Sequence, residues 1–147
     1  MVKRSKRLQP VLHIASLKTE KAVQALGVGQ QRLILEQSKL QQLQDYLKEY
    51  EQQVVVAGKA GLAVKTYLSH QQFISRLVTA IEQQKNQIQV VEGNVQLLTQ
   101  AWQKVHAHQK GLEKVIEKAE LEERALADKR DQQAMDERYQ RVRSTFS

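Results

Sequence analysis

From Ile74 onward, apolar residues recur at alternating intervals of three and four positions. Thirteen of the sixteen positions in this series are apolar, and the series lasts for about seven heptads. Because the alternation averages about 3.5 residues per turn, it keeps one stripe of a helix facing a partner helix that supercoils with it. The spacing therefore predicts a coiled coil. The positions are Ile74, Leu77, Ile81, Gln84, Ile88, Val91, Val95, Leu98, Trp102, Val105, Gln109, Leu112, Ile116, Ala119, Glu123 and Leu126.

The first half of the chain shows the same spacing. Ten of its thirteen positions are apolar. The weakest stretch is Gly27-Val28-Gly29, where each glycine should weaken a helix by about 1 kcal/mol. We therefore expect a second helix with its own apolar stripe, and both stripes together are called the seam. The positions are Leu12, Ala15, Thr19, Ala22, Leu26, Gly29, Leu33, Glu36, Leu40, Leu43, Leu47, Tyr50 and Val54.

Two glycines, Gly58 and Gly61, separate the two halves. Two long helices joined by a short loop run antiparallel. The sequence therefore predicts an all-α fold, an antiparallel two-helix coiled-coil hairpin whose second helix is longer than the first. We expect one domain over 1–147, with a basic tail at about 1–9, helices at about 11–57 and 65–141, and a loop at about 58–64.

Local signals refine the expected helix starts. Pro10 suits the first turn of the first helix, because its missing N–H would have no partner there. Ser69 is a candidate N-cap of the second helix, and Gln72 completes a capping box with it. With the loop centred near residue 60, Leu12 should lie level with about Gln109.

In that register, residues after about 110 have no partner inside the chain. Two interpretations remain open: this overhang docks on another molecule, or it is a free helix stabilised by ion pairs along its surface. Its apolar residues continue the stripe of the second helix. They are Leu112, Ile116, Ala119 and Leu126.

Composition excludes several classes of protein. Aromatic residues make up only 5% of the chain and proline occurs once, which is unlike a sheet protein. Cysteine is absent, so disulfides and thiolate metal sites are excluded. No apolar run is long enough to cross a membrane, and the basic start does not resemble an export signal, so we expect a cytoplasmic protein.

The net charge of +7 is concentrated at the start of the chain. Four basic residues lie within the first seven positions, and beyond them the charges nearly balance. Because basic residues interleaved with aromatic platforms are absent, we expect no nucleic-acid partner. A tail that is solvated, or that meets an acidic protein surface, explains this charge better.

No motif for catalysis, cofactor binding or metal binding is evident. Gly58-Lys59 lacks the upstream glycine and the following hydroxyl of a phosphate-binding loop. His13 and His106 could face each other across the hairpin, but a polar layer explains them better than a metal site does. We therefore expect no enzyme activity, no cofactor and no metal.

A second pair of rows lies beside the seam, near the loop. Each row has members at i, i+4, i+7 and i+11, which places them on one helical face. The rows should lie level with each other, and they hold much of the aromatic content of the chain. They either widen the seam or form an exposed protein-binding patch. This double row consists of Lys39, Leu43, Tyr46 and Tyr50 with Phe73, Leu77, Ala80 and Gln84.

Several segments resemble the FliJ family of the bacterial flagellar type III export apparatus. They are Asp45-Tyr46-Leu47-Lys48-Glu49-Tyr50, His70-Gln71-Gln72-Phe73-Ile74, Ala80-Ile81-Glu82-Gln83, Trp102, and Asp131-Gln132-Gln133-Ala134-Met135-Asp136-Glu137, in that order over nearly the whole chain. The resemblance implies a coiled-coil hairpin similar to the central stalk of rotary ATPases.

For function, the resemblance implies a non-enzymatic stalk that sits in the hexameric export ATPase ring and promotes its assembly. Such a stalk couples the ring to the cytoplasmic domain of the export gate, a membrane protein, and handles export chaperones. It would be cytoplasmic and peripherally associated with the inner membrane at the flagellar base, with a role in motility and chemotaxis. The alternatives are a stalk of a virulence-type secretion system or of a rotary ATPase, and a generic coiled-coil adaptor or homodimer. We expect the free hairpin to be a monomer.

The resemblance also assigns residues to these roles. The gate-binding pattern of the family matches the double row at Leu43, Tyr46, Tyr50, Phe73, Leu77 and Ala80. Lys39 and Gln84 depart from the family pattern and stand at its polar margins. The implied contacts with the ATPase ring come from the overhang and are Leu112, Ile116, Ala119, Leu126 and Met135.

Overall fold

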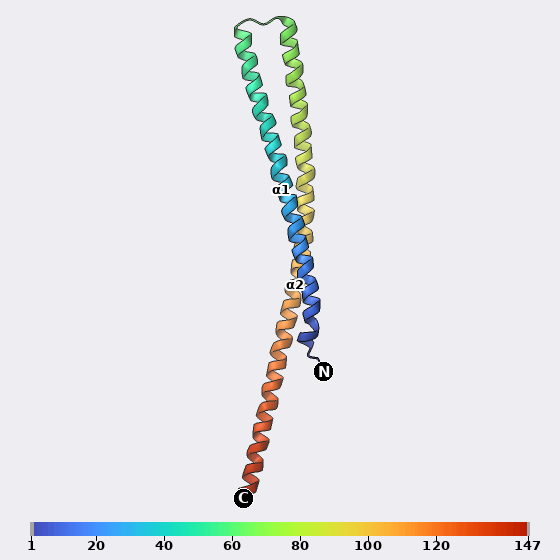
Figure 1. Ribbon diagram of the computed structural model, residues 1–147, viewed down its shortest axis with the longest axis vertical. Helices are drawn as coiled ribbons and strands as arrows, with labels where there is room; N and C mark the ends of the chain where they lie inside the picture. The colour runs from blue at the N-terminus through green and yellow to red at the C-terminus, as the bar shows by residue number, and fades with distance from the viewer. Residues whose placement is uncertain (1, 147) are drawn as a thin grey trace. The chain divides into compact units, whose positions relative to one another are not determined.

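The computed structural model describes residues 2–146, which form two long helices. Helix α1 spans Arg4–Lys59 and helix α2 spans Val64–Phe146. The two helices are antiparallel and in contact, and the second is the longer, as the apolar spacing predicts (Figure 1). Among the described residues, neither helix holds a segment apolar and long enough to cross a bilayer.

The chain divides into two compact units. One contains the chain up to Lys21 together with the chain from Gln103 onward, and the other is Ala22–Trp102. Each unit pairs a segment of α1 with an antiparallel segment of α2. The expectation of one coiled-coil domain stays a prediction.

The predicted seam forms the core of both units. Every seam position from Leu12 to Val54 and from Ile74 to Glu123 is buried or half-buried. The deepest side chain is Val91, which is 2% exposed. Gly29 is buried where the helices approach closely, since a methyl group added there would lie 2.7 Å from Cδ1 of Leu98. Burial of aliphatic side chains along this stripe is the main source of stability for such a pair of helices.

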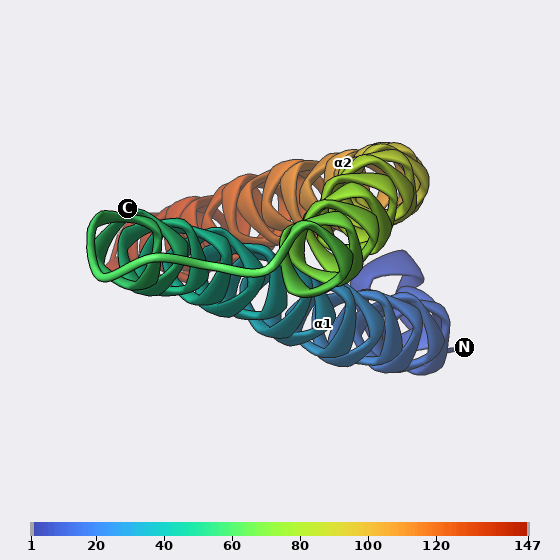
Figure 2. The same ribbon diagram turned by 90° about the horizontal axis from the view of Figure 1, so that it is seen from above.

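Residues 60–63 connect the two helices, and this short loop is seen from above in Figure 2. Gly61 has a φ of 94°, a conformation that residues with a Cβ rarely adopt. The N–H of Ala60 bonds to the carbonyl of Val56 and the N–H of Gly61 to that of Gly58, which closes the end of α1. Gly61, two residues beyond the last helical residue Lys59, therefore turns the chain out of α1, whereas Gly58 lies within the helix.

The start of α1 differs from the sequence prediction. The helix begins at Arg4 rather than near residue 11, so residues 4–9 are helical and Pro10 lies inside the helix. Ser5 explains the difference: its N–H and its hydroxyl both donate to the Glu123 carboxylate, at 3.1 and 2.7 Å. An acidic group at a helix N-terminus accepts from N–H groups that have no partner within the helix, and so stabilises the first turn.

The start of α2 also differs from the expected cap. The helix begins at Val64, and Ser69 lies within it, where its hydroxyl donates to the carbonyl of Lys65 at 3.1 Å. Serine hydroxyls make this bond when the helix continues through them. The capping-box assignment at Ser69 is therefore wrong.

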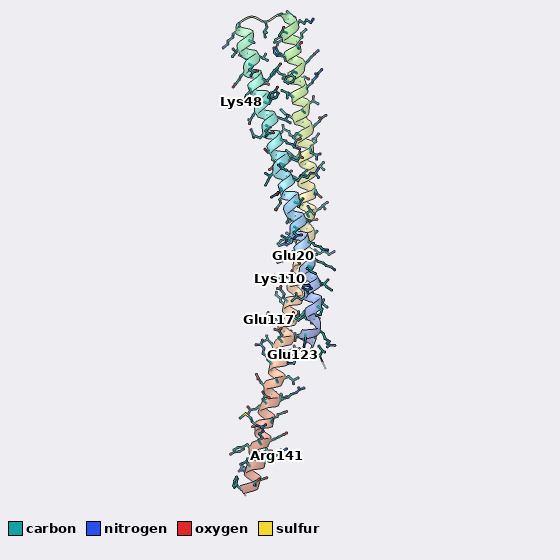
Figure 3. All side chains as sticks on the ribbon, in the orientation of Figure 1. Glu20, Lys48, Lys110, Glu117, Glu123 and Arg141 are labelled. Atoms are coloured by element: carbon teal, nitrogen blue, oxygen red, sulfur yellow. The ribbon has the colours of Figure 1, made fainter. Side chains whose placement is uncertain are left out.

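The predicted overhang begins too early. Ile116 and Ala119 are each 4% exposed, and Glu123 binds Ser5. Pairing continues to this point because α1 starts earlier than expected and because its first turns meet α2 further along than the predicted register. The unpaired part of α2 starts after Glu123, and every described residue from 124 to 146 is exposed (Figure 3).

Candidate functional site

An aromatic cluster joins the two helices near the loop. The ring centroids of Tyr50 and Phe73 are 4.6 Å apart, and those of Tyr46 and Phe73 are 6.1 Å apart in an edge-to-face arrangement. Tyr50 is also hydrogen-bonded to the imidazole of His70. Edge-to-face and tilted pairs are the favoured geometries of aromatic rings, so the three rings hold one another in place.

Tyr46 is the exposed member of this cluster, with 49% of its surface accessible. Beside it lies a shallow hollow of about 560 Å³, lined by Lys39, Gln42, Leu43, Tyr46 and Gln84. An aromatic ring that is fixed on one side and exposed next to an apolar hollow is a typical anchor point for a protein partner. The double row is therefore accessible at Tyr46.

The remaining members of the double row lie deeper. Tyr50, Phe73 and Ala80 are half-buried, and Leu77 is 7% exposed. Leu77 lies under the surface and supports it. The accessible part is centred on Tyr46 and the hollow.

A polar network borders the hollow, centred on Glu36. The Gln84 side-chain amide donates to the backbone carbonyl of Glu36 at 2.9 Å and to its carboxylate at 2.6 Å. The Lys39 ammonium group donates to the same carboxylate at 3.5 Å. Glu36 is 9% exposed, so this is a polar layer within the seam.

The contacts of Glu36 stabilise its charged form. The hydrogen bond from Gln84 lowers the pKa of the Glu36 carboxyl, burial opposes this, and the positive charges of Lys39 and Arg32 lower it further. Lys39 and Gln84, the polar margins of the predicted patch, thus both donate to the buried Glu36 carboxylate. Their side chains point at Glu36, and each still lines the hollow.

Sequence reasoning missed Glu36 and His70 as parts of this site. A signal for Glu36 was present, because Glu36 and Gln84 each interrupt the apolar seam and lie level in the predicted register. Polar residues at facing seam positions bind each other, because burying either one alone would leave it unsatisfied. His70 carried no such signal, because it lies outside the seam pattern, although its partner Tyr50 is a seam position.

The second predicted surface, on the later part of α2, is partly buried. Leu112 is half-buried and Ile116 and Ala119 are buried in the seam, so they are not accessible to a partner. Leu126 and Met135 are 51% and 65% exposed. The accessible surface of this region therefore begins at Leu126.

Among residues 2–146, no three histidine, cysteine or acidic side chains are grouped so that they could hold a metal ion. The double row combines fixed aromatic rings, a shallow hollow and a polar border.

Comparison with known families agrees with this architecture. The sequence model of the family described as the flagellar FliJ protein matches residues 4–144. The chain belongs to the FliJ family. No curated protein and no solved structure gives a significant match to it.

Membership makes this FliJ-family chain a protein of the flagellar export apparatus. The match spans both helices, including the double row and the exposed part of α2. The two surfaces found in the structure thus lie on parts of the chain that the family model covers.

Proposed function

We propose that this FliJ-family chain is a non-enzymatic stalk of the flagellar type III export apparatus. In this proposal it sits in the export ATPase hexamer, promotes assembly of the ring and couples it to the cytoplasmic domain of the export gate. It also handles export chaperones, and it works in the cytoplasm at the inner membrane. The ATPase hydrolyses ATP, and the chain supplies contacts only.

The half-exposed Tyr46 beside its hollow is the observation that carries the gate contact. Its ring is fixed by Phe73, so little side-chain freedom is lost when a partner binds. The hollow offers space of about 560 Å³ for a partner side chain, between the apolar Leu43 and the polar Gln84. This combination favours a short segment of the gate protein docking across the double row.

A paired experiment tests the gate contact. Tyr46→Ala should weaken binding of the purified gate domain by about 30-fold or more, because an exposed aromatic anchor typically contributes at least about 2 kcal/mol. Tyr67→Ala is the matched control, because Tyr67 is 48% exposed and lies outside the double row. Equal loss in both variants, or unchanged binding of Tyr46→Ala, would refute the double row as the gate contact.

The ring contact is tested separately. The double variant Leu126→Asp and Met135→Asp should no longer stimulate ATP hydrolysis by the export ATPase, because charges replace apolar contacts. Its binding of the gate domain should persist. In Tyr46→Ala the reverse pattern is expected. An unaltered hydrolysis rate with the Leu126→Asp and Met135→Asp double variant would exclude this segment of α2 as the ring contact.

A further inference from the structure

The part of the chain around the loop is unusually poor in charge. Charged residues make up 27% of the whole chain, yet residues 52–64 contain one, Lys59. Apart from Val54, this segment belongs to neither the seam nor the double row. Contiguous apolar residues on a protein surface mark sites of contact with proteins, membranes or ligands.

Its apolar side chains are exposed in the structure. Val55 and Val56 lie in the last turns of α1, with 57% and 68% of their surfaces accessible. Val64 and Leu68 lie one helical turn apart at the start of α2, with 75% and 55% accessible, and Tyr67 beside them is 48% exposed. These five residues are here called the apolar tip. They lie in the turns of α1 and α2 on either side of residues 60–63, the loop that joins the two helices in Figure 1.

The charge around the apolar tip has one sign. From Gln52 to Ile81 the chain contains no acidic residue, and its basic residues are Lys59, Lys65 and Arg76. Lys59 and Lys65 immediately border the loop. Their alkyl stems extend the apolar surface, while their ammonium groups suit an anionic surface.

We propose that the apolar tip inserts into the interfacial layer of a lipid bilayer that carries anionic headgroups. Aliphatic side chains enter the boundary of the acyl chains, lysines reach the headgroups, and tyrosine is favoured at this depth. A protein interface is a poorer fit, because lysine, the charged residue type on both sides of the loop, is depleted in such interfaces. This inference does not depend on the double row or on the gate.

Vesicle binding by the full chain tests the proposal. Vesicles of phosphatidylglycerol and phosphatidylcholine should bind the chain, and vesicles of phosphatidylcholine alone should bind it far less. Val56→Asp with Val64→Asp should weaken the binding by about tenfold or more, because each adds a negative charge and removes an inserted side chain. Val90→Asp is the control, because Val90 is 67% exposed on α2 outside the apolar tip. Equal binding by all these variants would overturn the proposal.

A label reports whether the tip enters the bilayer. The chain has no cysteine, so Val64→Cys accepts an environment-sensitive fluorophore at one site. Its emission should shift to shorter wavelength on anionic vesicles, and the same label at Val90→Cys should not shift. A shift that appears without lipid and together with a doubled mass would mean that a second copy of the chain covers the tip, and this result would also overturn the proposal.

Discussion

Glu36 illustrates how one polar residue fixes the alignment of two helices. Its carboxylate and its backbone carbonyl both accept hydrogen bonds from Gln84, so sliding α2 by one turn would remove the donor that α2 supplies to this buried carboxylate. Aliphatic seam residues specify the register less strictly, because a leucine can pack against apolar residues in more than one register. Polar residues at seam positions are known to specify register in coiled coils, at some cost in stability.

The contacts of the two interhelical carboxylates predict a dependence of stability on pH. The hydrogen bond from Gln84 to its carboxylate lowers the pKa of Glu36, and those from the hydroxyl and N–H of Ser5 lower the pKa of Glu123. Because both values are lower in the folded chain, the stabilisation is present above the ordinary value of 4.5 and is lost as the pH falls below it. We expect the melting temperature, followed by circular dichroism, to drop as the pH falls from about 4.5 towards about 3.

A variant separates these two groups from the other carboxylates. Glu36→Gln with Glu123→Gln should be less stable than the native chain at neutral pH and should lose less of its melting temperature on acidification. Identical pH profiles of the two proteins would show that neither carboxylate contributes.

Gly27 and Gly29 provide a matched pair for the cost of glycine in α1. Gly27→Ala should stabilise the chain by about 1 kcal/mol, because alanine favours the helix and nothing lies within 4 Å of the added methyl group. Gly29→Ala should gain less or nothing, because its methyl group would lie 2.7 Å from Cδ1 of Leu98 and force that side chain to move. Urea denaturation of both variants measures the difference, and equal gains would mean that Leu98 moves freely.

At the scale of the helices, α2 contains a paired part and an unpaired part. The boundary lies after Glu123, where the exposed stretch begins. The unpaired part buries no apolar side chain against α1, so its helicity depends on local interactions alone. Most of the stability of helices in proteins comes from the packing of an apolar face, and this part of α2 lacks such packing.

Truncation of α2 tests this division. A chain that ends at Ala127 should keep the melting temperature of the full chain to within a few degrees, whereas Glu123→Ala in the full chain should lower it by releasing Ser5 at the start of α1. Thermal unfolding followed by circular dichroism compares the two. A large loss of stability on truncation would show that residues after 127 contribute to the paired region.

The helices and the seam follow from the sequence because they depend on local spacing. Alternating steps of three and four residues fix which side of each helix is buried, and Gly61 marks the end of the first helix. The beginning of α1 does not follow from local signals, because it depends on a hydrogen bond between Ser5 and a residue 118 positions later. For the same reason, local spacing does not show that Ile116 and Ala119 are buried.

For the candidate site, spacing alone placed Tyr46 and Phe73 together, because each lies at a matching position of its own row. Spacing does not tell which members are exposed, and Leu77 proved to be buried. The degree of exposure depends on the distance between the helices at that level, which the sequence pattern does not specify.

At the scale of the whole molecule, the antiparallel pairing predicts a monomer. A native mass of 16.9 kDa is expected, since the seam is filled within one chain. Spin labels at Leu26 and Leu98 should report close approach in a sample diluted with unlabelled chain, because Gly29 lies against Leu98. Twice this mass, with the approach lost on dilution, would indicate a parallel dimer.

The four-residue connection at 60–63 also sets the order of events during folding. Contacts between the helices next to this loop close the shortest stretch of chain and so lose the least conformational entropy. The hydrogen bond between Ser5 and Glu123 closes the longest stretch, and it forms at lowest cost after the helices between them have paired. We therefore expect pairing of the two helices to begin beside the loop and to proceed towards the termini. During synthesis, we expect the seam residues of α1 to stay exposed until enough of α2 has been made to cover them.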